Sequence, residues 1–215
     1  LPGFKPIVLV GPEANRFVLV DHRDELLWRS AQDPITNLLR QGLLVIDGEQ
    51  HDALRRLMTP AFHRRMLARY VRAMGRYTDQ VSAAWPENEP LDMLDQIRRI
   101  AMLVLVDTMF GVDFTPEMAR LWPAVLRTLQ YISPGLWVVW PGMPRPGYAR
   151  SLRQLDSYLY ELIQRRRAAR QTEADDLLGL LVNTPELSDD LIRDQLFTML
   201  VAGHDTSTAL LAWAV

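Results

Sequence analysis

The sequence contains no cysteine among its 215 residues. Disulfide bonds and thiolate chemistry are therefore excluded within this chain, and cysteine usage gives no indication of the compartment. Neither sign of charge dominates, because 24 Lys and Arg stand against 26 Asp and Glu, for a net charge of −2. This balance gives no global argument for an anionic membrane or for nucleic acid, and no nucleic-acid partner is expected.

Several motifs with well-defined chemistry are also missing. The four histidines, His22, His51, His63 and His204, form no H-E-x-x-H or H-x-x-x-H pair. A metal site built only from side chains of this chain is therefore not expected. No glycine-rich phosphate loop follows a predicted strand, no G-x-S-x-G sequence occurs, and no internal repeat is visible.

What the sequence does contain is a succession of helix patterns, with 48% hydrophobic residues to fill a large core. The β-branched run at residues 7–10 predicts a strand, and Pro12 suits the first turn of a helix that reaches about Val20. Residues 30–44 predict a long loop with one helical turn. Further helices are expected at residues 47–59, 65–85, 91–110, 116–132, 149–170, 175–182 and from 188 onward. The fold class is therefore mainly α, in one domain, with a small β element near the start.

The last segment, residues 195–215, is nearly all apolar, yet it holds the polar sequence Ala202-Gly203-His204-Asp205-Thr206 at its middle. A helix that is apolar all round is buried. Gly203 weakens the helix by about 1 kcal/mol relative to Ala, and a Thr hydroxyl beside a loosened turn can bond to backbone, water or ligand. A membrane span is disfavoured, because Asp205 at its centre costs about 2.5–3.5 kcal/mol. The simpler alternative is a core helix with a satisfied polar patch.

A second candidate site is the pair His51 and Arg55, which lie four residues apart and so share one helix face. Their N–H donors suit a carboxylate or a phosphate, although a plain surface pair is the simpler alternative. Arg56 points to another face and is expected to be solvated. Residues 133–147, with Trp137 and Trp140, predict either a packed loop or an apolar entrance. The basic residues 165–170 are expected to form a solvated helix end, with partner docking as the alternative.

These patterns occur together in an order that resembles one known family. The sequences concerned are Gly48-Glu49-Gln50-His51, Arg55-Arg56, Thr59-Pro60-Ala61-Phe62, Met109-Phe110-Gly111, Asp175-Asp176-Leu177-Leu178 and Ala202-Gly203-His204-Asp205-Thr206. The chain resembles the N-terminal part of a cytochrome P450, a haem-thiolate monooxygenase, over essentially its whole length. Residues 1–215 are accordingly expected to be a partial domain of this fold, truncated at both ends.

The resemblance implies roles for the two candidate sites. His51 and Arg55 would donate to the propionates of haem (iron protoporphyrin IX), which is the cofactor expected in the complete protein. Asp205 and Thr206 would be the catalytic residues, acting in oxygen activation and proton delivery over the distal face of the haem. Gly203 would open the helix locally to admit dioxygen and water.

The substrate side of the site follows from the same resemblance. Ala202 would lie against both the haem and the substrate, with Met199 nearby in the substrate pocket. The expected partners are O₂, a small apolar substrate and an electron donor, either a ferredoxin or a flavoprotein reductase. A cytoplasmic, bacterial-type member is expected.

One departure from the family pattern is important. The family's axial ligand is a cysteine thiolate, and this chain has no cysteine, so the metal ligand is not among these residues. The complete protein is expected to insert one oxygen atom from O₂ into an apolar organic substrate, whereas the fragment alone is expected to be inactive. The alternative is a non-catalytic helical remnant or binding module for small hydrophobic ligands.

Overall fold

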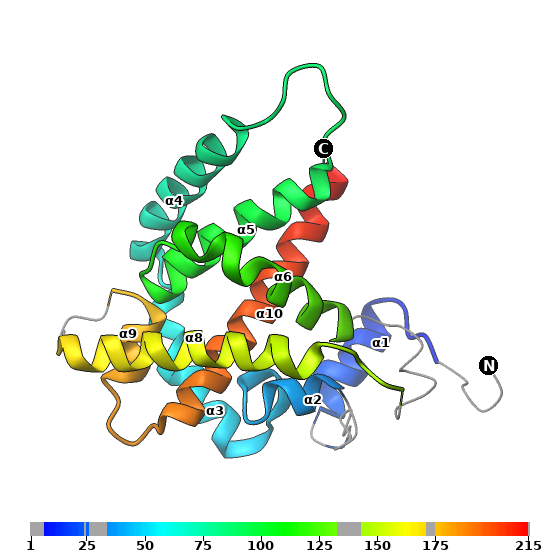
Figure 1. The fold of residues 1–215 in the computed structure, drawn as a ribbon. Coiled ribbons are helices and arrows are strands. Elements are labelled where there is room, and N and C mark those ends of the chain that lie inside the picture. The colour runs from blue at the N-terminus through cyan, green and yellow to red at the C-terminus, as the bar shows by residue number, and fades with distance from the viewer. Residues whose placement is uncertain (1–6, 24, 26–33, 133–142, 171–174, 215) are drawn as a thin grey trace.

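The computed structural model describes residues 7–23, 25, 34–132, 143–170 and 175–214. All regular structure in these ranges is helical (Figure 1). In chain order the elements, with η for short π- or 3₁₀-helical segments, are α1 (Pro12–Arg16), η1 (Phe17–Asp21), α2 (Pro34–Leu39), η2 (Leu43–Val45), α3 (Gly48–Met58), η3 (Thr59–Phe62), α4 (Arg64–Ser82), α5 (Met93–Phe110), α6 (Thr115–Ile132), α8 (Tyr148–Ala169), α9 (Leu177–Val182) and α10 (Asp189–Ala214). The mainly α prediction is confirmed.

The small β element is not found among the described residues. Residues 7–10 have no regular secondary structure, and their side chains are 52% to 86% exposed. A strand is stable only when its N–H and C=O groups pair with a neighbouring strand, and the described part of the chain provides none. The β-branched run alone therefore did not suffice to predict a strand.

Local sequence signals set the ends of α5. The carboxylate of Asp92 accepts a hydrogen bond from the backbone N–H of Asp95 at 3.1 Å, which caps the first turn. Gly111 ends the helix in the left-handed conformation with φ 66°. A Cβ at Gly111 would also lie only 2.3 Å from Oδ2 of Asp176. Both the backbone angle and the close contact therefore require glycine at this position.

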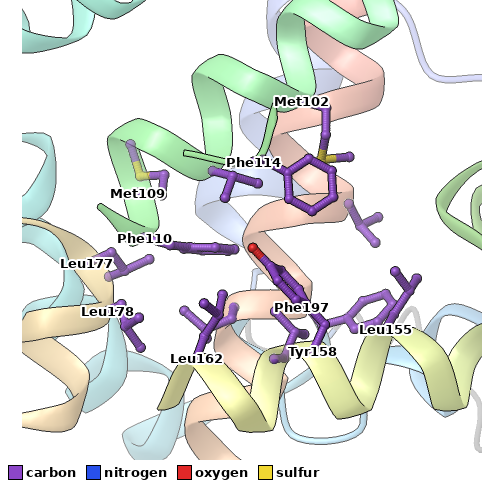
Figure 2. Packing of buried hydrophobic residues seen from close by; sticks show 14 of the residues in the cluster. Met102, Met109, Phe110, Phe114, Leu155, Tyr158, Leu162, Leu177, Leu178 and Phe197 are labelled. Atoms are coloured by element: carbon purple, nitrogen blue, oxygen red, sulfur yellow. The ribbon is translucent and has the colours of Figure 1, made fainter. Parts of the chain in front are cut away.

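The core lies where α5, α8 and α10 pack together, with α6 and α9 beside them. Figure 1 shows α10 crossing α8 on its way through the molecule, and Figure 2 shows Met102, Phe110 and Tyr158 turned into the space that these helices enclose. Phe110 is fully buried, and Phe197 of α10 is 2% exposed. Burying one side chain of this size stabilises the fold by about 1.5–3 kcal/mol, so this cluster fixes α10 against its neighbours.

The burial of α10 differs along its length. Residues 192–198 are all buried, although they include Arg193, Asp194 and Gln195, whereas residues 206, 207, 209–211, 213 and 214 are exposed. The second half of α10 is therefore covered on one side only by the described residues. In the described ranges, no helix is both long enough and apolar enough to cross a membrane.

The basic end of α8 is solvated only in part, because Arg165 and Arg170 are exposed as expected but Arg166 and Arg167 are partly buried. Arg166 donates to the carboxylate of Asp176 at 2.9 Å and to the carbonyl of Phe110 at 2.8 Å. Arg167 donates to Asp189 at 2.8 Å. These two side chains join α8 to the ends of α5 and α9 and to the start of α10. The loop prediction at residues 133–147, with Trp137 and Trp140, lies largely outside the described residues.

Candidate functional site

The sequence Ala202–Thr206 lies within α10, which continues through it as an unbroken helix. Its residues point to different sides. A Cβ at Gly203 would lie 2.7 Å from Cδ1 of Leu105, so Gly203 faces α5 and lets the two helices approach closely. The role of Gly203 in opening the helix stays a prediction, because the structure shows the packing contact alone.

Thr206 lies on an exposed side of α10. Its hydroxyl donates to the carbonyl of Ala202 at 2.7 Å, one turn earlier in the helix. Ala202, Leu210 and Trp213 share this side at helical spacing, and the latter two are 73% and 91% exposed. The residue predicted to act on oxygen therefore stands on an open, mostly apolar helix face.

His204 and Asp205 lie on the side of α10 that meets α5 and α6. The imidazole of His204 is fully buried. Its Nε2 lies 3.1 Å from the carbonyl oxygen of Arg98 on α5, and its Nδ1 lies 3.1 Å from Oδ1 of Asp205. Adjacent helix residues ordinarily point in different directions, yet here the two side chains meet.

A cavity of about 530 Å³ lies between α5, α6 and α10. Its lining includes Leu94, Arg98, Leu129, Gln130, Asp205 and Thr208. The hydroxyl of Thr208 is buried and has no hydrogen-bond partner among the described residues. Asp205 therefore lines this cavity, whereas Thr206 does not.

The two residues predicted for the substrate pocket, Met199 and Ala202, are both half-buried. Met199 packs against the hydrophobic core, and neither residue lines the 530 Å³ cavity. Ala202 shares the open face of α10 with Thr206. A substrate pocket at these two residues stays a prediction.

His51 and Arg55 lie on α3, which begins at Gly48 after Asp47 without a side-chain capping bond. His51 Nδ1 lies 2.9 Å from Oδ1 of Asp52, and this hydrogen bond lowers the pKa of the Asp52 carboxyl. The Arg55 guanidinium is exposed and pairs with no described residue, although the Arg55 carbonyl accepts a bond from the Thr59 hydroxyl. Of the two predicted anion ligands, Arg55 has its whole guanidinium available, whereas His51 already shares Nδ1 with Asp52.

The segment between α2 and η2 is attached to α10 by three consecutive buried side chains. Arg193 donates to the carbonyl of Leu38 at 3.0 Å, and Asp194 accepts from the N–H of Gln41 at 3.1 Å. Gln195 accepts from the N–H of Leu43 at 2.8 Å and donates to the carbonyl of Gln41 at 2.9 Å. We call this set of bonds the α10 latch.

The α10 latch links the two candidate sites indirectly. The segment η2 contacts both α10 and α3, and α9 also contacts both. The latch therefore fixes the approach of α3, with His51 and Arg55, to the helix that carries Thr206. Sequence reasoning missed this latch, whose only signal was a polar triplet inside an otherwise apolar helix.

Sequence reasoning also missed His204, which it considered only as a metal ligand. Among the described residues, no group of three or more His, Asp or Glu side chains gathers in a way that could hold a metal ion. The spacing of residues in the sequence gave no signal that the carbonyl of Arg98 would lie against the ring of His204.

The sequence is similar to those of known proteins. The sequence matches the family model for cytochrome P450 over residues 2–215. A putative cytochrome P450 137 of Mycobacterium tuberculosis is 34% identical over 210 residues, which cover 89% of this chain and 43% of that protein. Cyclooctatin synthase of Streptomyces melanosporofaciens is 28% identical over 226 residues, which cover 99% of this chain and 49% of that protein.

The fold of the chain is also similar to the folds of solved cytochrome P450 structures. The chain is similar to retinoic acid-bound cyanobacterial CYP120A1 with a TM-score of 0.74 and 24% identity, over 94% of this chain and 47% of the other. The heme domain of cytochrome P450DA also gives a TM-score of 0.74, at 24% identity, over 91% of this chain and 47% of the other. The chain thus spans about half the length of the curated relatives it matches.

Proposed function

The chain belongs to the cytochrome P450 family, and from this premise we propose that the complete protein is a haem-dependent monooxygenase. It inserts one atom of dioxygen into an apolar organic substrate and reduces the other to water. The observation that carries the proposal is the placement of Thr206. Its hydroxyl lies on the open face of α10, and the preceding residue in the sequence, Asp205, lines the cavity.

The family and fold imply a haem cofactor in the complete protein. Haem supplies the oxygen and electron-transfer chemistry, and the protein supplies binding, orientation and electrostatics. The described residues fit this group in two places. Arg55 offers an unpaired guanidinium for a propionate carboxylate, and the open face of α10 offers apolar surface beside Thr206. A thiolate ligand would come from outside these 215 residues, because they include no cysteine.

We assign the following work to the residues of this chain. Arg55, assisted by His51, binds and neutralises a carboxylate at α3. The Thr206 hydroxyl, held by the Ala202 carbonyl, donates a hydrogen bond on the open face. Asp205 exchanges protons with solvent through the 530 Å³ cavity. Met199 and Ala202 contact the apolar substrate, a ferredoxin or flavoprotein reductase provides electrons, and the location is cytoplasmic.

The test compares three variants of the complete protein. Thr206→Ala removes the hydroxyl, Thr206→Ser keeps it, and Ser207→Ala removes an exposed neighbouring hydroxyl as a matched control. We expect Thr206→Ala to consume O₂ with several times less product per O₂ and more hydrogen peroxide. The Ser variant and the Ser207→Ala control should stay coupled. Normal coupling in Thr206→Ala, or absence of bound haem in the unmodified protein, would overturn the proposal.

A further inference from the structure

The buried ring of His204 has an acceptor against each of its two nitrogens. The carbonyl oxygen of Arg98 lies 3.1 Å from Nε2, and the carboxylate of Asp205 lies 3.1 Å from Nδ1. Both distances are those of direct hydrogen bonds, and the His204 ring is fully buried. The two contacts together constrain where protons reside.

The constraint follows from counting donors. A peptide carbonyl can only accept, so Nε2 of His204 must carry a proton. A neutral imidazole then has a bare lone pair at Nδ1, which would face the lone pairs of an ionised Asp205 carboxylate. The contact is a hydrogen bond only if one further proton lies between Nδ1 and Oδ1, either on the imidazole or on the carboxyl. Without that proton, Nδ1 and Oδ1 make no hydrogen bond with each other. The free energy spent on removing both atoms from water is then not recovered.

The surroundings of the pair contain charge of both signs, and solvent reaches it from one side. On α5, the side chain of Arg98 lines the same cavity as Asp205, and Asp95 binds Arg99 at 2.7 Å. On α6, the ring of Trp122 packs edge-on against His204 with centroids 6.0 Å apart. Asp205 itself is 40% exposed, and so only Asp205 offers the pair a route to solvent.

We propose that His204 and Asp205 share one exchangeable proton, and that His204 is the positioning residue that holds this carboxyl toward the cavity. The proposal rests on the proposed function and deepens it, because a monooxygenase consumes two protons and two electrons for each O₂ that it splits. The proton passes between Nδ1 and Oδ1 without any change of oxidation state. When Asp205 releases it, a proton from the cavity replaces it.

The cavity itself supports this exchange. Thr208 lines it, and the buried hydroxyl of this residue lacks a partner among the described residues. Polar cavities of this size hold ordered water that bonds to such groups. A proton from solvent then reaches the pair through this cavity, on the side where Asp205 is exposed.

The test reads protonation directly, independently of turnover. The complete protein is labelled with ¹⁵N-histidine and with ¹³C at aspartate carboxyls, and spectra are recorded in the diamagnetic, reduced, carbon monoxide-bound state. His204→Gln identifies the His204 signals among those of the other histidines. At pH 7.5 we expect either both ring nitrogens of His204 to be protonated, or one ring proton with a protonated Asp205 carboxyl. A singly protonated ring beside an ionised Asp205 would overturn the proposal.

Asp205→Asn is the companion variant for the same measurement. The Asn amide donates to Nδ1, so the ring needs no second proton, and we expect His204 to become neutral with a proton only on Nε2. Where the unmodified ring carries protons on both nitrogens, a His204 spectrum unchanged by this substitution would contradict the shared proton. Loss of folding in either variant is detected by circular dichroism. In that case the spectra of the unmodified protein still show how many protons the His204–Asp205 pair carries.

A functional readout separates this inference from the proposed function. His204→Gln keeps an N–H for the Arg98 carbonyl but cannot store a second proton, so product per O₂ should fall severalfold with haem content unchanged. His63→Gln, at an exposed histidine, is the matched control. If the carbon monoxide spectrum shows no thiolate-ligated haem, the proposed function fails, whereas the spectra of His204 and Asp205 still test the pair.

Discussion

Arg193 of α10 and Asp156 of α8 form an ion pair in which Nε lies 2.7 Å from Oδ1, and the guanidinium is fully buried. The same guanidinium donates to Asp194 at 2.9 Å and stacks on the ring of Phe197 at 4.5 Å. Every part of this cation is therefore in contact with protein. Removing one of its anionic partners leaves a buried charge with reduced compensation.

Asp156→Ala should accordingly destabilise the protein by about 3 kcal/mol, near the lower end for breaking a buried pair because Asp194 remains. Arg193→Met should be destabilising as well, because it leaves both Asp156 and the buried Asp194 without this cation. Urea unfolding at pH 7 measures both effects. A single variant that costs less than about 1 kcal/mol, the range of surface ion pairs, would contradict the burial argument.

Gly42 provides a second test of the α10 latch. A Cβ at this position would lie 1.8 Å from Oγ1 of Thr198 and 3.0 Å from the carbonyl oxygen of Asp194. Its φ of −66° suits any residue, so the cost of Gly42→Ala comes from contact alone. We expect a destabilisation of about 1–3 kcal/mol, as for overpacked cores, with partial recovery when Thr198→Ala is added. Equal stability of Gly42→Ala and the unmodified protein would show that the segment is not tightly held.

The helices after residue 60 were predictable because each carries local signals. The expected helix at residues 91–110 is α5 (Met93–Phe110), which Asp92 caps and Gly111 terminates. The expected helix at residues 149–170 is α8 (Tyr148–Ala169). Such signals act over a few residues and so can be read without knowledge of the fold.

Features that depend on distant partners could not be predicted in this way. The α10 latch pairs Arg193, Asp194 and Gln195 with backbone about 150 residues earlier in the chain. Arg166 looked like a solvated charge until Asp176 and the end of α5 were in place. His204 needed the carbonyl of Arg98 on another helix before its proton requirement appeared. Sequence patterns identify which side chains are polar, but only packing determines what they contact.

Asp113 gives a prediction for the pH dependence of stability. Burial acts most strongly on the pKa of its carboxyl and raises it, but hydrogen bonds from Thr115 and from Tyr77 together lower the pKa below its ordinary value. A carboxyl with a lowered folded-state pKa contributes stability above its unfolded pKa of about 4, and this contribution is lost as the pH falls through the folded value.

Asp113→Asn should therefore cost about 1 kcal/mol at neutral pH, comparable to the loss of a helix-start hydrogen bond. The difference in unfolding free energy between the unmodified protein and the variant should stay constant from pH 8 to about pH 5 and shrink below that. Urea unfolding at several pH values between 8 and 3.5 measures this difference. A difference that grows on acidification would show that the pKa is raised.

Arg55 and Arg56 offer a matched comparison for the anion site on α3. Both are exposed cations in the last turn of the helix, but only Arg55 shares a face with His51. Because Arg55 pairs with no described residue, Arg55→Leu should change the unfolding free energy by less than about 0.5 kcal/mol. It should instead lower the haem-to-protein ratio of the purified complete protein severalfold, since a propionate loses its bidentate partner.

Arg55→Lys should retain an intermediate haem ratio, because an ammonium keeps the charge but not the paired geometry. Arg56→Leu removes the same charge from a different face and should retain haem at the unmodified level. Haem content is measured by absorbance and protein by amino-acid analysis, so the comparison does not require turnover. Equal haem loss in Arg55→Leu and Arg56→Leu would indicate a general effect of net charge, and full retention in Arg55→Leu would remove this residue from the site. Loss in Arg55→Leu alone ties haem binding to the face of α3 that His51 and Arg55 share.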